Sequence, residues 1–186
     1  MNIDDIMYDI IENKYNEIES LQNEKGKFFK IKYFEGNAIG QIGEEFVKEI
    51  FRKNKIPFED NGKIIHDEYD ILSGNKKIEI KTARKGKNNN SFQFSGLNPS
   101  YNVDTLILIG LTVKQIYYLI INDNIIYNHK NRKYYMKVNN KEKQIVAMNP
   151  NNQVNYKLTL NLSDLKPIDT LEKELKEMFK KINSLY

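Results

Sequence analysis

Three stretches of the chain repeat apolar residues at the spacing of an amphipathic helix. Residues 3–23 carry apolar side chains on one face and acidic residues on much of the other. A second helix is predicted over Ile42–Lys53, ahead of Pro57, and a third over Leu171–Leu185. The apolar positions that define these helices are Ile3, Ile6, Met7, Ile10, Ile11, Tyr15, Ile18 and Leu21, then Ile42, Phe46, Val47, Ile50 and Phe51, and finally Leu171, Leu175, Met178, Phe179 and Ile182.

The middle of the chain changes to the patterns of β-strands. Thr105–Leu111 is continuously apolar, as expected for a strand that is buried on both faces. Phe28–Phe34 fits either a short strand or an extension of a helix. The other predicted strands are Ile64–Leu72, Lys77–Ala83, Ser91–Phe94, Gln115–Ile121 and Ile125–Tyr127, the last pairing back after a turn, with further β structure over 128–161. This order predicts an α/β or α+β fold with one mixed sheet of about four to six strands.

Length and composition limit the classes of protein that need to be considered. At 186 residues the chain fits a single domain, 1–186, and it has no cysteine for disulfides, zinc–thiolate sites or a thiol nucleophile. The longest apolar stretch, Val103–Ile121, is interrupted by charged and polar residues, and the first residues lack the pattern of a signal peptide. We therefore expect a cytoplasmic protein with no membrane partner.

The net charge of +4 is distributed unevenly along the chain. Residues 1–80 hold 12 basic against 17 acidic residues, a net charge of −5, whereas residues 81–143 hold 11 against 3, a net charge of +8. A basic segment that follows a group of carboxylates indicates a nucleic acid as partner. The alternative is an ordinary solvated lysine surface.

The basic segment begins at Lys81, in the alternating run Lys77-Ile78-Glu79-Ile80-Lys81-Thr82. Alternation sends Ile78 and Ile80 to one face of a strand and Glu79 and Lys81 to the other, about 7 Å apart. An isolated Glu-x-Lys can also be an exposed ion pair. If Leu72 pairs with Lys77, however, Asp70 lies opposite Glu79, and the two carboxylates share a face. A three-residue turn would place Asp70 opposite Ile78 instead.

Two carboxylates and a lysine on one face form a plausible centre for cleaving phosphodiesters. Asp70 and Glu79 offer the oxygen ligands that Mg²⁺ prefers, leaving room for waters and a substrate phosphate. The metal would polarise the phosphate and activate a water. Lys81 would stabilise the developing charge or help to orient and deprotonate that water.

These residues resemble the PD-(D/E)xK nuclease superfamily, which includes many restriction endonucleases and repair nucleases. The resemblance covers about residues 36–121, and Tyr69 stands where proline usually precedes the first acid. It implies a restriction-endonuclease-like catalytic core of a mixed sheet flanked by helices, preceded by an N-terminal helical segment (1–35) and followed by a β-rich segment with a C-terminal helix (122–186). It also implies that Asp70 and Glu79 bind Mg²⁺ and that Lys81 is the catalytic lysine.

Many relatives carry a further glutamate on the preceding helix, after a glycine and ahead of apolar residues. Gly40-Gln41-Ile42-Gly43-Glu44 resembles this pattern, with Val47 and Phe51 following. Glu44 is therefore the predicted third metal ligand and catalytic acid, and Glu45 is the alternative. An acid near a helix N-terminus is also favoured by the helix dipole alone.

The segment after the catalytic strand supplies candidate DNA-binding residues. The loop Arg84–Asn90 can bind phosphates through its cations and read base edges through its amides. Gln93 resembles a glutamine that follows the lysine in some relatives. The candidates are Arg84, Lys85, Lys87, Asn88 and Gln93. We therefore expect a Mg²⁺-dependent endonuclease of double-stranded DNA, most like a small Type II restriction enzyme and a homodimer because palindromic sites match two-fold symmetry. A structure-specific repair or recombination nuclease of the junction-resolvase kind and a non-catalytic DNA-binding protein are the alternatives.

Overall fold

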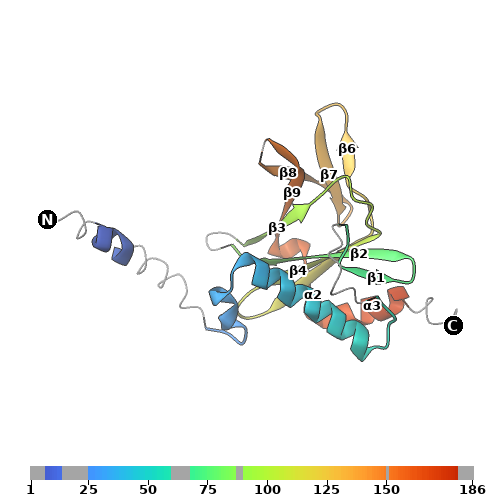
Figure 1. Ribbon diagram of the computed structural model, residues 1–186, viewed down its shortest axis with the longest axis horizontal. Coiled ribbons are helices and arrows are strands. Elements are labelled where there is room, and N and C mark those ends of the chain that lie inside the picture. Colours follow the sequence, from blue (N-terminus) through green and yellow to red (C-terminus); the bar gives the residue numbers. More distant parts are fainter. Residues whose placement is uncertain (1–6, 14–24, 60–67, 87–89, 150, 180–186) are drawn as a thin grey trace.

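The computed structural model describes residues 7–13, 25–59, 68–86, 90–149 and 151–179, and its helices and strands confirm the predicted α+β class (Figure 1). Residues 7–13 are helical, and the labelled helices are η1 (Phe29–Tyr33), α2 (Gly36–Lys53), η2 (Leu162–Asp164), η3 (Ile168–Thr170) and α3 (Leu171–Phe179). The strands are β1 (Ile71–Ser73), β2 (Lys76–Arg84), β3 (Ser91–Leu97), β4 (Thr105–Leu111), β5 (Ile116–Ile121), β6 (Ile126–Asn128), β7 (Lys133–Val138), β8 (Lys141–Asn149), β9 (Asn152–Asn161) and β10 (Lys166–Pro167).

The first sheet is mixed and has the strand order β1-β2-β4-β5-β10. Strand β2 runs parallel to β4, and the other pairs are antiparallel. Helices α2 and α3 cover one face of this sheet (Figure 1). There Val47 and Phe51 of α2 pack with Ile78 and Ile80 of β2 and with Phe179 of α3. Burial of these side chains fixes α2 over the strand that carries Glu79 and Lys81.

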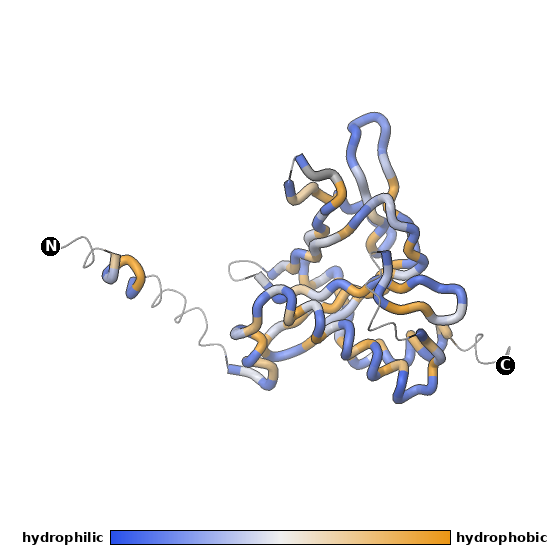
Figure 2. Tube along the Cα trace, viewed as in Figure 1, coloured by the Kyte–Doolittle hydropathy of each residue, from blue (hydrophilic) through white to orange (hydrophobic). Residues whose placement is uncertain are grey.

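A second sheet covers the other face of the first. Its five strands are all antiparallel, in the order β3-β9-β8-β7-β6. Its inner side chains, such as Phe92 and Leu158, pack with Leu106 and Leu108 of β4. All seven residues of β4 are buried, as its apolar sequence predicted. Figure 2 shows apolar residues along the strands of the first sheet and mostly hydrophilic loops around them.

The predicted mixed sheet is present with five strands, but the prediction of a single sheet was wrong, because the described residues also form a second sheet of five strands. The predicted strand at Ile125–Tyr127 does not pair back onto β5, whose free edge is occupied by β10 through Tyr117 and Tyr118. It forms β6 instead and pairs with β7. A strand that is apolar on both faces needs two covering layers, and the second sheet supplies the one that the helices leave out.

Other boundaries also differ from the prediction. Helix α2 begins at Gly36 and not at Ile42, because glycines interrupt the apolar period of its first turns. Phe28–Phe34 contains the 3₁₀ helix η1 and no strand. Within the predicted strand Ile64–Leu72, the described part is a strand only from Ile71. Of the predicted helices at residues 3–23 and 171–185, only residues 7–13 and 171–179 are among the described residues. No described helix combines the length and apolar character needed to cross a membrane.

Candidate active site

The β1–β2 hairpin has the register that the predicted site requires. Leu72 pairs with Lys77 and Ile71 with Ile78, across a tight turn in which Gly74 has φ +60°. The strand pairing ends at Ile71, and Asp70 lies one residue beyond this last pair. Its backbone N–H donates to the Ile78 carbonyl (2.9 Å), and its carboxylate Oδ2 accepts the Ile80 N–H (2.7 Å). The hairpin therefore holds the Asp70 carboxylate against the edge of β2.

Glu79 and Lys81 extend from the face of β2 opposite to α2. Their neighbours Ile78 and Ile80 belong to the core beneath the helix, as the alternating pattern predicted. Glu79 is buried, with 11% of its side chain exposed, and its Oε1 forms an ion pair with the Lys81 ammonium group, whose side chain is 22% exposed. Ion pairs in such partly buried positions interact more strongly than pairs on the open surface.

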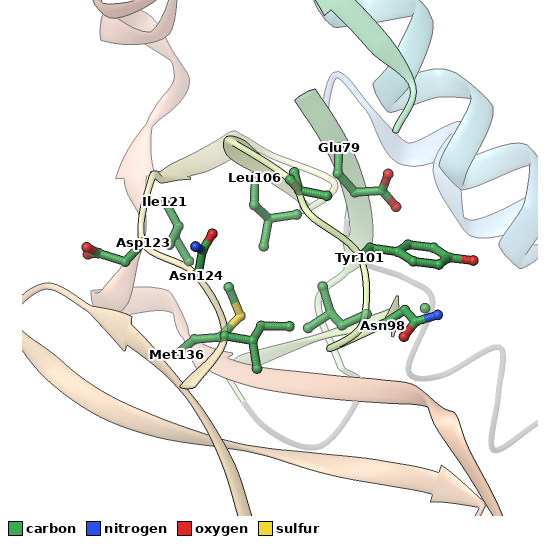
Figure 3. Close-up of a pocket in the computed structure, with 12 residues that line it drawn as sticks. Glu79, Asn98, Tyr101, Leu106, Ile121, Asp123, Asn124 and Met136 are labelled. Atoms are coloured by element: carbon green, nitrogen blue, oxygen red, sulfur yellow. The ribbon is translucent and has the colours of Figure 1, made fainter. Parts of the chain in front are cut away.

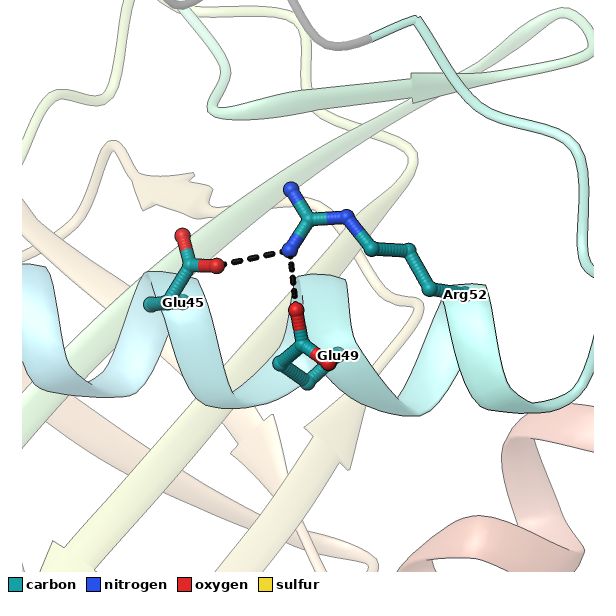
Figure 4. A network of polar contacts seen from close by, with 3 residues as sticks. All are labelled: Glu45, Glu49 and Arg52. Carbon is teal, nitrogen blue, oxygen red and sulfur yellow. Dashed lines mark hydrogen bonds and ion pairs between the residues drawn. The ribbon is translucent and has the colours of Figure 1, made fainter.

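Glu44 and Glu45 point in different directions from α2. Glu45 is 61% exposed and accepts a hydrogen bond from Arg52 (2.6 Å), which also pairs with Glu49 on the outer surface of the helix (Figure 4). Glu44 is half-buried and close enough to Asp70 and Lys81 for their charges to change its pKa. Of the two glutamates, Glu44 is therefore the one grouped with Asp70 and Glu79.

Burial makes all three carboxylates harder to ionise, and the charge of Asp70 adds to the effect at Glu79 and Glu44. Burial, followed by the charge of Asp70, raises the pKa of Glu79 to about 7. Burial raises the pKa of Asp70, although the Ile80 N–H and the charges of Lys81 and Lys48 oppose it. Burial and then Asp70 likewise raise the pKa of Glu44. Carboxylates forced together in this way gain stability when a cation is added.

The donor set fits a hard divalent cation such as Mg²⁺ by its chemistry. Asp70, Glu79 and Glu44 provide oxygen ligands only, and a cation would relieve the repulsion of Glu79 and Glu44 by Asp70. In their present rotamers, the described residues contain no cluster of three or more Asp, Glu or His side chains already close enough to enclose a metal. Binding would therefore require these side chains to turn toward a shared ion.

A cationic groove begins at Thr82, the residue after Lys81, and follows the open edge of β2. Strand β1 pairs with β2 only as far as Ile78. Among the described residues, the part of β2 after Ile78 therefore has no strand partner on that side. The groove, about 650 Å³, lies between the start of α2 and the outer side of β3. Its polar lining includes Arg84, Lys85 and Gln93, which are three of the predicted DNA-binding residues. The other two, Lys87 and Asn88, lie outside the described residues.

The structure qualifies the role of Arg84 and adds two lysines. The Arg84 guanidinium donates to the carbonyls of Ile31 (2.9 Å) and Lys32 (3.2 Å), so it also holds η1 against the sheet. Lys32 lines the groove, and Lys48 faces the carboxylates, where its charge lowers the pKa of Asp70 and Glu44. Lys48 is one helical turn after Glu44, a spacing that could have indicated it; Lys32 reaches the site only through tertiary packing.

Comparisons of this chain with protein-family models, with curated proteins and with solved structures give no match. The functional argument therefore depends on the residues of the site themselves.

Proposed function

We propose that this protein is a Mg²⁺-dependent endonuclease that hydrolyses phosphodiester bonds of double-stranded DNA. One observation supports this function above all others. Asp70 of the hairpin, Glu79 of β2 and Glu44 of α2 lie near enough to Lys81 for its charge to act on each of them, and a cationic groove begins at the next residue of β2, Thr82. Acidic ligands, a lysine and a basic groove are the components needed to hold a metal beside a phosphate.

Each residue of the cluster has a distinct role in the proposed reaction. Asp70, Glu79 and Glu44 would hold the ion, which when bound supplies Lewis-acid chemistry and an activated water. Lys81, held next to Glu79, would donate to a non-bridging oxygen of the scissile phosphate and stabilise the negative charge that develops there. The Ile80 N–H holds Oδ2 of Asp70 against β2, which limits how far this ligand would have to turn toward the ion.

The groove would receive the DNA backbone on one side of the scissile phosphate. Lys85 and Lys32 are positioned along it for contacts to phosphates, which position a duplex without reading its sequence. Gln93, which is exposed on the outer side of β3, carries an amide suited to reading a base edge.

A Type II restriction enzyme is the biological role we propose, with a homodimer as the active form. Two-fold symmetry would present one active site to each strand of a palindromic target. The helix at residues 7–13 supports this proposal, because Met7, Ile10 and Ile11 are each 57% exposed. Exposed apolar faces of this kind mark interaction surfaces. Mass measurement in solution tests the dimer separately from the activity.

The activity is tested with supercoiled plasmid, linear genomic DNA and a four-way junction, each with Mg²⁺ or with EDTA. We expect Mg²⁺-dependent cleavage of plain duplex at discrete sites, and loss of at least about 100-fold in rate in Lys81→Ala. Lys141→Ala, which removes an exposed lysine of β8, is the matched control and should cleave normally.

The possible results separate the proposal from its alternatives. Cleavage of the junction alone would replace a restriction role by a structure-specific one. DNA binding with Ca²⁺ but no cleavage by the wild-type protein would identify a non-catalytic DNA-binding protein. Full metal-dependent cleavage by Lys81→Ala would show that the assignment of the catalytic centre is wrong.

A further inference from the structure

The loop between β3 and β4 borders the proposed active site on the side away from the cationic groove. It follows Leu97, and Gly96 near the end of β3 has φ +79° and lies so close to the lysine that a Cβ there would be 3.4 Å from Lys81 Nζ. It ends at Asp104, whose N–H donates to the Lys77 carbonyl (3.0 Å) and whose Oδ2 accepts the Lys77 N–H (2.8 Å). The loop is therefore fixed to β2 at Asp104, and the Gly96 N–H donates to Asn155 Oδ1 of β9 (3.0 Å) where the chain passes Lys81.

Hydrogen bonds within the loop also hold its shape. The side-chain Oδ1 of Asn98 accepts the N–H (3.0 Å) and the hydroxyl (2.7 Å) of Ser100, and the Tyr101 N–H donates to the Asn98 carbonyl (3.1 Å). Pro99 restricts the backbone within the same turn. A loop with these constraints presents its side chains in a defined position before any ligand arrives.

Tyr101 is the aromatic side chain that this loop brings to the catalytic carboxylate. Glu79, Asn98 and Tyr101 line one pocket and extend toward the same side of it (Figure 3). Behind them, the pocket has an apolar floor that includes Leu106, Ile121 and Met136. Tyr101 is half-buried, so one part of its ring packs on the protein and another part is open to a ligand.

We propose that Tyr101 is a substrate-binding residue whose ring stacks on the DNA nucleotide that flanks the scissile phosphate, on the side opposite to the groove. This inference rests on the proposed nuclease function. Charges in the groove would fix the backbone on one side of the reacting phosphate, and Tyr101 would fix a base or sugar on the other. Contacts on both sides hold the phosphate in place next to Glu79 and Lys81. Aromatic stacking suits this position because every base has a π face.

The chain contains no tryptophan, so Tyr101→Trp creates a single fluorescent reporter that keeps an aromatic ring at the site. The variant is titrated with mixed-sequence genomic duplex fragments in Ca²⁺. We expect saturable quenching, with the same midpoint as binding measured independently by filter retention. Tyr8→Trp, on the exposed 7–13 helix, is the matched control and should show no saturable quenching.

Two further variants separate stacking from a merely structural role of Tyr101. Tyr101→Phe keeps the ring and should retain most of the DNA affinity, whereas Tyr101→Leu should bind DNA about 5- to 100-fold more weakly. Both variants should keep the wild-type thermal midpoint. If Tyr101→Phe is as defective as Tyr101→Leu, the hydroxyl is the active group and stacking is wrong.

The results also distinguish this inference from the proposed function. Intact DNA binding without quenching of the tryptophan at position 101 overturns the stacking role alone. Quenching by DNA, together with a wild-type protein that cleaves no DNA, overturns the nuclease function but supports the stacking contact. Absence of DNA binding by the wild-type protein overturns both.

Discussion

Replacing Glu79 by glutamine should make the metal-free protein more stable at neutral pH while it removes a ligand of the proposed metal centre. The pKa of Glu79 is raised from 4.5 to about 7, mainly by burial and by the charge of Asp70. The folded protein therefore binds this proton more tightly than the unfolded chain does. For a carboxyl group whose folded pKa is raised, stability is highest below about pH 4.5 and falls as the pH rises toward 7.

The size of the effect follows from the same two values. The difference between 7 and 4.5, at about 1.4 kcal/mol per pKa unit, gives at most about 3–4 kcal/mol of destabilisation at pH 8. Glutamine avoids this cost because it carries no charge, and its oxygen can still accept a hydrogen bond from Lys81. Loss of the ion pair with Lys81 offsets part of the gain. We therefore expect Glu79→Gln to be more stable than wild type by about 1–2 kcal/mol at pH 8 and similar to it at pH 4.5.

Urea unfolding in EDTA at several values between pH 4.5 and 8 measures this difference directly. Glu45→Gln is the matched control, because its carboxylate lies on the exposed face of α2 and pairs with Arg52. This control should follow the pH dependence of the wild-type protein. The reasoning is refuted if the free energies of unfolding of Glu79→Gln and wild type differ by the same amount at every pH, or if Glu79→Gln is the less stable protein at pH 8.

Three other predictions follow from the geometry of the site. Mg²⁺ should raise the thermal midpoint of the wild-type protein at pH 8 more than at pH 5, as scanning calorimetry would show, because protonated carboxyl groups bind metal weakly; an equal shift at both values would argue against carboxylate ligands. Gly43→Ala should destabilise the protein by about 1–3 kcal/mol in urea unfolding, since a Cβ there would overlap the Thr82 side chain, and a neutral effect would contradict this packing. Lys85→Ala and Lys32→Ala should each reduce the slope of log affinity for DNA against log salt by about 1, and an unchanged slope would exclude phosphate contacts by these lysines.

The central hairpin could be predicted because its sequence signals are local. Alternation over Lys77–Ala83 identifies the two faces of β2, and Gly74 allows the tight turn that sets the register. Thr105–Leu111 was predicted correctly for a similar reason, since a run of apolar residues needs cover on both faces. The position of Asp70 beside the Ile78–Ile80 segment of β2 follows from this hairpin.

Long-range pairing could not be predicted from the same signals. Strand β10 has only two residues, and nothing in its sequence indicates that it would occupy the edge of β5. Residues 128–161 alternate well enough to predict strands, but alternation does not specify which sheet they join. Lys32 and Tyr101 approach the candidate site from η1 and from a loop, so their relevance depends on tertiary contacts that a single sequence does not reveal.

Cleavage of supercoiled plasmid by the purified protein is the most direct test of the proposed metal-dependent centre. Wild type, Asp70→Asn and Glu45→Gln are assayed side by side, with Mg²⁺ and with EDTA. Wild type and Glu45→Gln should cut with Mg²⁺ alone, and Asp70→Asn should lose the activity while it remains folded. Equal cleavage by Asp70→Asn, or cleavage that persists in EDTA, would contradict a metal-dependent active site at Asp70, Glu79, Glu44 and Lys81.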